Sequence, residues 1–230
     1  MMVAAEIVEY TDPFCPWAWG TEPKLAQLRS ELAGRIRWRR VLGVLLDGTE
    51  PPSVDEQLER WQAIAAYTGM SLPPRLERSP STSRLAARAI KAAELQSHEC
   101  GGALLRRLRE SLFVDGRPAE DEEAILVVAA ETQLDTAKLR ADLHGEASRR
   151  AVEADWNETR RPLPDVIGLT EPEPHPGGAV PDGDLLRYRF PTVVVRASER
   201  YQVVPGWRPY ETYLDAFAAV ASDCVEIASP

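Results

Sequence analysis

The stretch that decides the fold is residues 12–19, which read Asp-Pro-Phe-Cys-Pro-Trp-Ala-Trp. Residues 3–10 before it are rich in β-forming side chains and end at a turn signal, so they predict a strand. Pro16 is a favoured first residue of a helix, and leucines at helical spacing follow it up to a glycine. We therefore expect a helix over 16–33, with Cys15 directly before its first residue.

The segments farther out complete an α/β pattern. Residues 35–42 alternate between arginine and apolar side chains and then become apolar, which predicts a second strand. A helix between two strands favours a parallel pair. Near the other end of the chain, 190–195 and 201–204 predict a β-hairpin, and 208–221 predict a final helix. The order is therefore β-α-β, an interruption, and then β-β-α.

The interruption is predicted to be helical. Residues 53–158 contain almost no β-branched runs and carry several apolar stripes with helical spacing. We expect an α/β domain made of residues 1–52 and 159–230, with residues 53–158 inserted into it as an all-helical subdomain.

A long segment over 160–187 is rich in proline and glycine. A loop of that length inside a compact chain is uncommon and is usually either functional or disordered. If it folds over Cys15, His175 within it could stabilise a thiolate or act as an acid or base there. The alternative is a solvated loop histidine without a role.

The composition excludes several classes of function. The 230 residues carry 27 basic and 36 acidic side chains, a net charge of −9, which argues against binding to nucleic acid. With 44% hydrophobic residues, the chain can form a core. Neither a secretory signal nor a membrane-spanning apolar run is visible. We therefore expect a cytoplasmic protein with reduced thiols and without a membrane partner.

Cys15 is the residue with the clearest chemistry. A cysteine before a helix faces unpaired backbone N–H groups and the positive end of the helix dipole, and both favour the thiolate. We therefore expect its pKa to lie below the value of about 8.5 of a free cysteine, which would make it a nucleophile in disulfide exchange. The alternative is a small buried apolar side chain. Cys100 and Cys224 lie elsewhere in the chain, and we expect neither to pair with Cys15.

The sequence Cys15-Pro16-Trp17-Ala18 resembles the Cys-Pro-Trp-Cys redox motif of the FrnE-like branch of the DsbA family. Residues 83–89 and 206–211 are also similar to that family. The resemblance implies a thioredoxin fold with an inserted helical domain, thiol–disulfide oxidoreductase activity, and a cis-proline, Pro191, that opens a strand and faces the active cysteine. It implies Cys15 as the nucleophile and a substrate groove formed by Pro16, Trp17, Ala18, Phe190, Pro191 and Trp207.

The sequence departs from that motif at Ala18, which stands where the family has its second cysteine. Cys15 therefore lacks a resolving partner at that distance, and the expected chemistry is monothiol. The Cys15 thiolate would attack a disulfide or mixed disulfide, and an external thiol would release it. Oxidation of Cys15 to a sulfenic acid is a second route. We expect no bound cofactor, a low-molecular-weight thiol as co-substrate, and a disulfide-containing protein or small thiol as partner.

Two other interpretations stay open. Kappa-class glutathione transferases and 2-hydroxychromene-2-carboxylate isomerases resemble this layout, with a serine where Cys15 stands, and they bind a low-molecular-weight thiol without a second cysteine. A redox-inactive module could instead bind a partner or peptide in the groove beside Pro191. We expect no metal site, because His98-Glu99-Cys100 lacks further spaced ligands.

Overall fold

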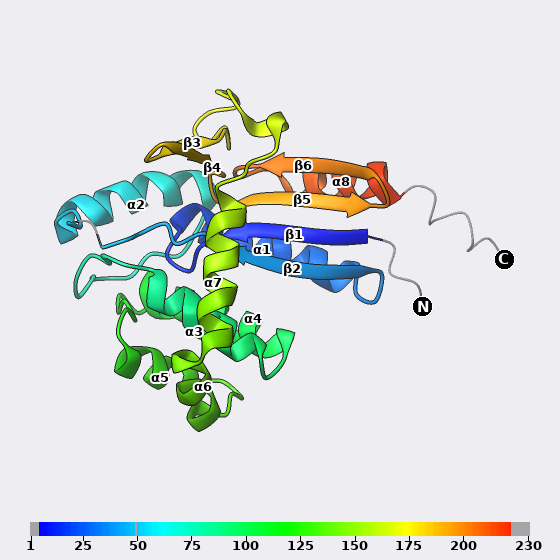
Figure 1. The fold of residues 1–230 in the computed structure, drawn as a ribbon. Helices are drawn as coiled ribbons and strands as arrows, with labels where there is room; N and C mark the ends of the chain where they lie inside the picture. The colour runs from blue at the N-terminus through cyan, green and yellow to red at the C-terminus, as the bar shows by residue number, and fades with distance from the viewer. Residues whose placement is uncertain (1–4, 49, 222–230) are drawn as a thin grey trace. The chain divides into compact units, whose positions relative to one another are not determined.

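Figure 1 shows the computed structural model of the chain, which describes residues 5–48 and 50–221. The chain divides into two compact units. The sheet unit comprises the described residues of 1–11, 21–41 and 158–230, and the helical unit comprises those of 12–20 and 42–157.

A four-stranded sheet with the strand order β2-β1-β5-β6 organises the sheet unit (Figure 1). Its strands are β1 (Ala5–Thr11), β2 (Ile36–Leu42), β5 (Thr192–Ala197) and β6 (Arg200–Pro205). β5 runs antiparallel to both β1 and β6, whereas the arrows of β1 and β2 point the same way in Figure 1. The parallel β-α-β start and the closing hairpin therefore agree with the sequence pattern.

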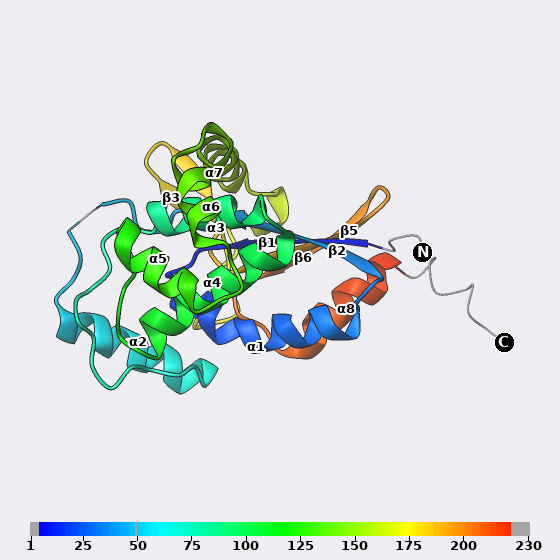
Figure 2. The same cartoon turned by 90° about the horizontal axis from the view of Figure 1, so that it is seen from below.

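Two helices cover one face of this sheet, as Figure 2 shows. They are α1 (Pro16–Glu31) and α8 (Tyr210–Ala221). Leu25 and Leu28 of α1 and Phe217 of α8 are buried against the sheet together with Ile7 and other strand residues. Burying these apolar side chains on a common face is what holds the helices to the strands. This mixed α/β arrangement is thioredoxin-like, so the predicted fold class is confirmed.

The helical unit contains the predicted helices and has its own core. Trp61, Leu104 and Phe113 are almost completely buried in it. Ser53 begins the first helix with a capping box, in which its side chain and that of Glu56 satisfy each other's backbone N–H groups. The helices that start in this part of the chain are α2 (Val54–Thr68), α3 (Arg84–Glu94), α4 (His98–Phe113), α5 (Glu122–Ala130), α6 (Thr136–His144) and α7 (Glu146–Thr159).

The division into units differs from the expected domains at 12–20 and 42–52, which group with the helices. The reason is packing: Phe14 and Leu42 belong to the core of the helical unit. The second boundary, between residues 157 and 158, lies one residue from the expected position. Residues 12–19, which contain the Cys15 motif, are therefore part of the helical unit.

The proline- and glycine-rich segment 160–187 has regular structure. It contains a 3-10 turn, η1 (Pro164–Val166), and a small hairpin of β3 (Val180–Asp182) and β4 (Leu185–Arg187). The backbone N–H of Ala179 donates to the Val166 carbonyl at 2.7 Å, which ties the turn to the hairpin. Within the part of the chain that the structure describes, no helix is long and apolar enough to cross a membrane.

Candidate active site around Cys15

Cys15 occupies the position immediately before α1, as expected, with Pro16 as the first helical residue. The Cys15 N–H donates to the Asp12 carbonyl at 3.3 Å, and the Cys15 carbonyl accepts from the Trp19 N–H at 3.0 Å. The chain thus makes a tight turn and enters the helix through Cys15 itself. Ala18 is buried one turn further on.

The pKa of Cys15 differs from the expectation. Burial of the thiol, which is 3% exposed, raises its pKa to about 11, and the negative charge of Asp12 adds to the rise. The N–H groups of Ala18 and Trp17 and the charge of Arg109 act in the opposite direction. The predicted helix-terminus effect is present, but the prediction of a lowered pKa is wrong because desolvation outweighs it.

Asp12 is a buried carboxylate that anchors the turn. Its Oδ1 accepts from the Phe14 N–H at 2.8 Å. Its Oδ2 accepts from the Leu45 N–H and from the Ser83 hydroxyl, both at 2.7 Å. Burial raises the pKa of Asp12, and these donors and the Arg109 charge oppose that rise. The three donors hold the turn before Cys15 against two other segments of the helical unit.

Arg109 brings a positive charge to the same place. It lies on α4 and is fully buried. Its Nη2 donates to the Asp12 carbonyl at 3.3 Å. Its charge lowers the pKa of both Asp12 and Cys15. The site therefore contains a thiol, a carboxylate and a guanidinium in a desolvated environment, where charges interact more strongly than in water.

The local sequence around Asp12 predicts only a turn, and no prediction falls on Arg109. A signal for Arg109 exists, because it shares the spacing of Leu105, Leu108 and Leu112 on the buried face of α4. An arginine at an apolar position in a helix is costly to bury without partners, and it therefore marks a polar site in the core.

The two tryptophans of the motif have different surroundings. Trp17 is half-buried, and its ring meets the Tyr67 ring edge-on at a centroid distance of 6.3 Å. Tyr67 is 48% exposed. Trp19 stacks on Phe113 at a centroid distance of 6.1 Å, so it packs against the core of the helical unit. Trp17 and Tyr67 thus form an aromatic edge on the helical unit, and Trp17 remains a predicted substrate contact.

The predicted groove residues Phe190 and Pro191 lie in the sheet unit and are buried. The peptide bond between them is cis, in agreement with the expectation from the resemblance. The Pro191 carbonyl accepts from the Gly206 N–H at 2.9 Å. The Arg187 guanidinium lies over the Phe190 ring, 5.3 Å from its centroid. These contacts order the start of β5.

Trp207 and His175 pack together in the sheet unit. The backbone N–H of Trp207 donates to His175 Nδ1 at 3.1 Å. Lys24 Nζ lies 3.3 Å from the centroid of the Trp207 ring. Burial lowers the pKa of His175 to about 3, and the charges of Arg189 and Arg208 contribute. His175 is therefore buried and neutral at neutral pH, and its contribution at Cys15 stays a prediction.

Cys100 is not bonded to Cys15. Cys100 lies in the first turn of α4, where its N–H donates to the Ser97 hydroxyl at 3.1 Å, and neither Cys15 nor Cys100 is in a disulfide. Cys224 lies outside the described residues. Within residues 5–48 and 50–221, no group of three or more His, Cys, Asp and Glu side chains could hold a metal ion.

The structure therefore gathers the predicted site residues in two places. Cys15, Pro16, Trp17 and Ala18 lie in the helical unit with Asp12 and Arg109, and Phe190, Pro191, Trp207 and His175 lie in the sheet unit.

The topology and this motif define a protein of the thioredoxin-fold class with a helical insertion. The chain belongs to the thioredoxin family, because the family model described as Thioredoxin matches residues 9–161. It is similar to the ClpXP adapter protein SpxH of Bacillus subtilis (strain 168), with 32% identity over 155 residues that cover 65% of this chain and 52% of that protein. The chain thus spans about half the length of the curated relatives it matches.

Two solved structures share the fold. The cytosolic disulfide reductase DsbM from Pseudomonas aeruginosa is 22% identical, with a TM-score of 0.65 and coverage of 97% of this chain and 100% of that chain. A probable DsbA oxidoreductase from Streptomyces coelicolor is 19% identical, with a TM-score of 0.66 and coverage of 98% and 92%. These likenesses establish a DsbA-like thioredoxin fold.

Proposed function

We propose that the protein is a thiol–disulfide oxidoreductase of monothiol type with Cys15 as its nucleophile. The observation that carries the proposal is the position of Cys15 at the start of α1, where the N–H groups of Trp17 and Ala18 favour its thiolate. Ala18 stands one turn away, where a resolving cysteine would be required for an internal disulfide. Exchange with an external thiol is the chemistry that this pair of features supports.

The proposed reaction has two balanced steps. The Cys15 thiolate attacks one sulfur of a disulfide, the old S–S bond breaks, and the departing thiolate takes up a proton. An external thiolate then attacks the mixed disulfide on the sulfur of its bound group. The Cys15 thiolate leaves, and a new external disulfide forms. One substrate sulfur is thereby released as a thiol, and the other ends in a disulfide with the external thiol, while Cys15 is unchanged overall. A second external thiol is needed to release that sulfur and complete the reduction.

The raised pKa of Cys15 limits this reaction. With a pKa of about 11, roughly one Cys15 in ten thousand is a thiolate at pH 7. Burial is the largest cause of the rise, so exposure of the sulfur to water would lower the pKa toward the value that the helix N–H groups favour. The proposal therefore predicts a thiol that reacts slowly while its sulfur is buried.

The proposal extends to the finer features that the resemblance implies. It assigns the chain to the FrnE-like branch of the DsbA family and to the cytoplasm, with a disulfide-containing protein or a small thiol as its partner. It assigns substrate contacts to Pro16, Trp17 and Ala18 in the helical unit and to Phe190, Pro191 and Trp207 in the sheet unit. The structurally similar DsbM is named a cytosolic disulfide reductase, which is consistent with the proposed activity and compartment.

The test is intact-protein mass spectrometry after incubation with oxidised glutathione, followed by reduced glutathione. Turnover is measured separately, as the reduction of bis(2-hydroxyethyl) disulfide by reduced glutathione. We expect one glutathione adduct on Cys15, its removal by reduced glutathione, and catalytic turnover of the disulfide. Cys15→Ser should lose both the adduct and the turnover, whereas the matched variant Cys100→Ser should keep them. Turnover that persists in Cys15→Ser would contradict the proposal and favour the transferase- or isomerase-like interpretation.

A second candidate is a protein-binding adapter without redox chemistry. It is favoured by the similarity to proteins named ClpXP adapter protein SpxH, together with the buried, weakly acidic thiol. Binding of the purified chain to the ClpX unfoldase, measured by biolayer interferometry, tests it. An adapter should bind equally well as the native chain and as Cys15→Ser, and absence of binding would reject this candidate.

A further inference from the structure

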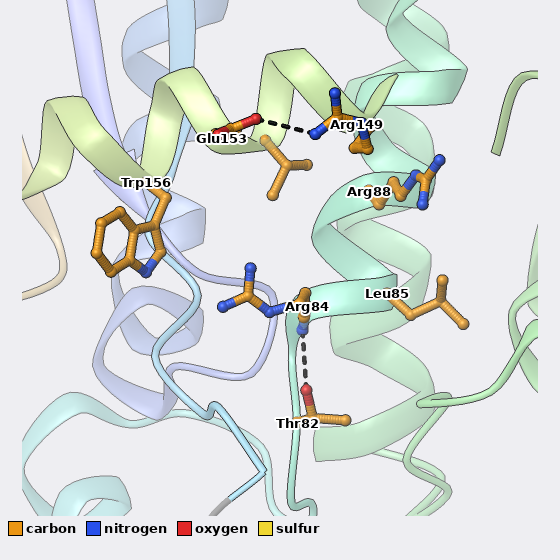
Figure 3. Close-up of a pocket in the computed structure, with 8 residues that line it drawn as sticks. Thr82, Arg84, Leu85, Arg88, Arg149, Glu153 and Trp156 are labelled. Atoms are coloured by element: carbon orange, nitrogen blue, oxygen red, sulfur yellow. Dashed lines mark hydrogen bonds and ion pairs between the residues drawn. The ribbon is translucent and has the colours of Figure 1, made fainter. Parts of the chain in front are cut away.

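A cavity of about 620 Å³ lies in the helical unit between the first turns of α3 and the side of α7 (Figure 3). This volume is that of a site for a small organic molecule. In Figure 3 the guanidinium groups of Arg88 and Arg149 lie toward one end and the ring of Trp156 lies at the other. The cavity belongs to the helical unit alone and does not include the motif around Cys15.

Arg88 is the residue that gives the cavity its charge. It is half-buried on α3, and its Nε donates to the Ser148 hydroxyl at 3.3 Å. Its Nη2 donates to the Gly145 carbonyl at 3.1 Å. Both acceptors are neutral, and among the ion pairs of the described residues none within 4.0 Å involves Arg88. The guanidinium is thus held in a fixed orientation without a carboxylate in contact.

By contrast, the other two arginines of the cavity are each in ion pairs with carboxylates. Arg84 makes a two-pronged ion pair with Asp47, with its Nη2 2.9 Å from Oδ1. Arg149 pairs with Glu146 at 2.6 Å and with Glu153 at 3.2 Å. Their charges are largely cancelled, and they add hydrogen-bonding capacity at the rim. Among the described residues, Arg88 has no carboxylate within 4.0 Å, although its charge contributes to lowering the pKa of the nearby Glu146, and it is therefore the least neutralised of the three arginines toward a ligand inside the cavity.

The start of α3 adds to the positive potential. Ser83 is the N-cap residue, but its hydroxyl donates to Asp12 and makes no capping hydrogen bond. The amino end of this helix, at Arg84, therefore contributes its dipole at the rim of the cavity. This favourable field for an anion is notable because the whole chain has a net charge of −9.

The rest of the lining is apolar. Leu85 and Val152 contribute aliphatic surface, and Trp156 contributes an aromatic face. Small-molecule sites combine such surfaces with a few polar groups that orient the ligand. We propose that this cavity binds a small organic anion, with an aromatic or other apolar body between Leu85, Val152 and Trp156 and a carboxylate or similar acid against Arg88. The site is separate from the proposed redox function of Cys15.

Isothermal titration calorimetry with three matched probes tests the proposal. The probes are 2-naphthoate, which has both features, naphthalene-2-carboxamide, which lacks the charge, and acetate, which lacks the apolar body. We expect saturable binding of one 2-naphthoate per chain. The carboxamide should bind at least about tenfold more weakly because it loses a charge-assisted hydrogen bond, and acetate should bind at least about tenfold more weakly because it lacks the buried ring. Equal binding of the acid and the amide would overturn the proposal.

Two variants make the assignment specific. Arg88→Gln should weaken 2-naphthoate binding at least about tenfold and leave carboxamide binding unchanged. Glu153→Gln removes an exposed negative charge at the cavity and leaves Arg149 with Glu146 as its remaining carboxylate partner, so it should strengthen 2-naphthoate binding several-fold.

The matched control is Glu123→Gln, which removes one of the two carboxylate partners of the exposed Arg140 on another part of the unit and should have no effect. Binding that is insensitive to both Arg88→Gln and Glu153→Gln would overturn the assignment. Binding of an acidic peptide in the absence of 2-naphthoate binding would also overturn it, in favour of a protein partner.

Discussion

The hydroxyl of Ser83 donates a hydrogen bond of 2.7 Å to the carboxylate of Asp12, 71 residues away in the sequence. Both side chains are completely buried. The contact joins the turn before Cys15 to the N-cap residue of α3. Through it, the conformation of the cysteine turn depends on the folding of the helical unit.

Removal of this contact should destabilise the protein. Ser83→Ala leaves a buried carboxylate oxygen with one donor fewer, so we expect the free energy of unfolding to fall by about 1–3 kcal/mol. Urea denaturation followed by circular dichroism measures it. The exposed Ser30→Ala serves as control and should change stability by less than about 0.5 kcal/mol. A loss equally small in Ser83→Ala would show that the bond does not anchor the turn.

The charge of Asp12 should hold back the reactivity of Cys15. Asp12→Asn removes a negative charge that raises the pKa of the thiol, so the pKa should fall. A fall of one unit would increase the thiolate fraction at pH 7, and the rate of alkylation by iodoacetamide, about tenfold. The exposed Asp47→Asn should leave the rate unchanged. An unaltered or slower rate in Asp12→Asn would refute the inferred electrostatic coupling.

Arg109 should have the opposite effect on the thiol. Arg109→Met removes a charge that lowers the pKa of Cys15, so alkylation at a given pH should slow. Because the buried Asp12 loses its cationic neighbour, stability should also fall by about 3 kcal/mol or more. Arg109→Lys keeps the charge and should alkylate at nearly the native rate, and Arg106→Gln on the exposed side of α4 should be neutral. Slow alkylation in the lysine variant would point to packing instead of charge.

His175 should make the stability of the protein depend on pH. Its folded pKa of about 3 lies below the ordinary value of 6.5, so below about pH 6.5 the unfolded chain binds a proton that the folded chain does not. This group alone should therefore reduce the free energy of unfolding by about 1.4 kcal/mol for each pH unit from 6 to 4.

The matched variant for this effect is His175→Asn, whose side-chain oxygen can accept from the Trp207 N–H in place of Nδ1. Denaturation curves at pH 7, 6, 5 and 4 should show a shallower decline for the variant than for the native chain. Parallel declines would mean that His175 does not titrate as inferred.

Ala18 should be the determinant of the monothiol chemistry. Ala18→Cys places a second thiol one helical turn from Cys15, and we expect an internal disulfide to form on oxidation. Mass spectrometry should then show loss of two hydrogens and little lasting glutathione adduct, because the new cysteine resolves it. The double variant Cys15→Ser with Ala18→Cys should form no internal disulfide. A persistent adduct in Ala18→Cys would contradict this role of position 18.

Local patterns account for the parts of the fold that sequence analysis predicted well. Pro16 and the leucine spacing up to Leu32 define α1, and the valines after Pro191 define β5. Each depends on residues that are neighbours in the chain, and so does the position of Cys15 before a helix. The resemblance of the motif then supplied the cis-proline, which the structure contains.

Long-range contacts account for what could not be predicted. Asp12 has donors from Leu45 and Ser83, and Arg109 reaches it from α4. No local pattern links these residues. His175 is buried although its neighbours in the sequence are prolines and glycines typical of an exposed loop.

Short-range spacing and residue identity are enough to predict the strands and helices of the β-α-β start and the β-β-α end, the place of the cysteine and the absence of its second sulfur at Ala18. They do not predict the small hairpin of β3 and β4 inside the proline- and glycine-rich segment. Only the tertiary structure decided how acidic Cys15 is. The pKa of a thiol depends on the water it loses and on the charges that approach it, and both are set by segments distant in the chain. The same reason explains the cavity at Arg88, which forms where α3 and α7 meet.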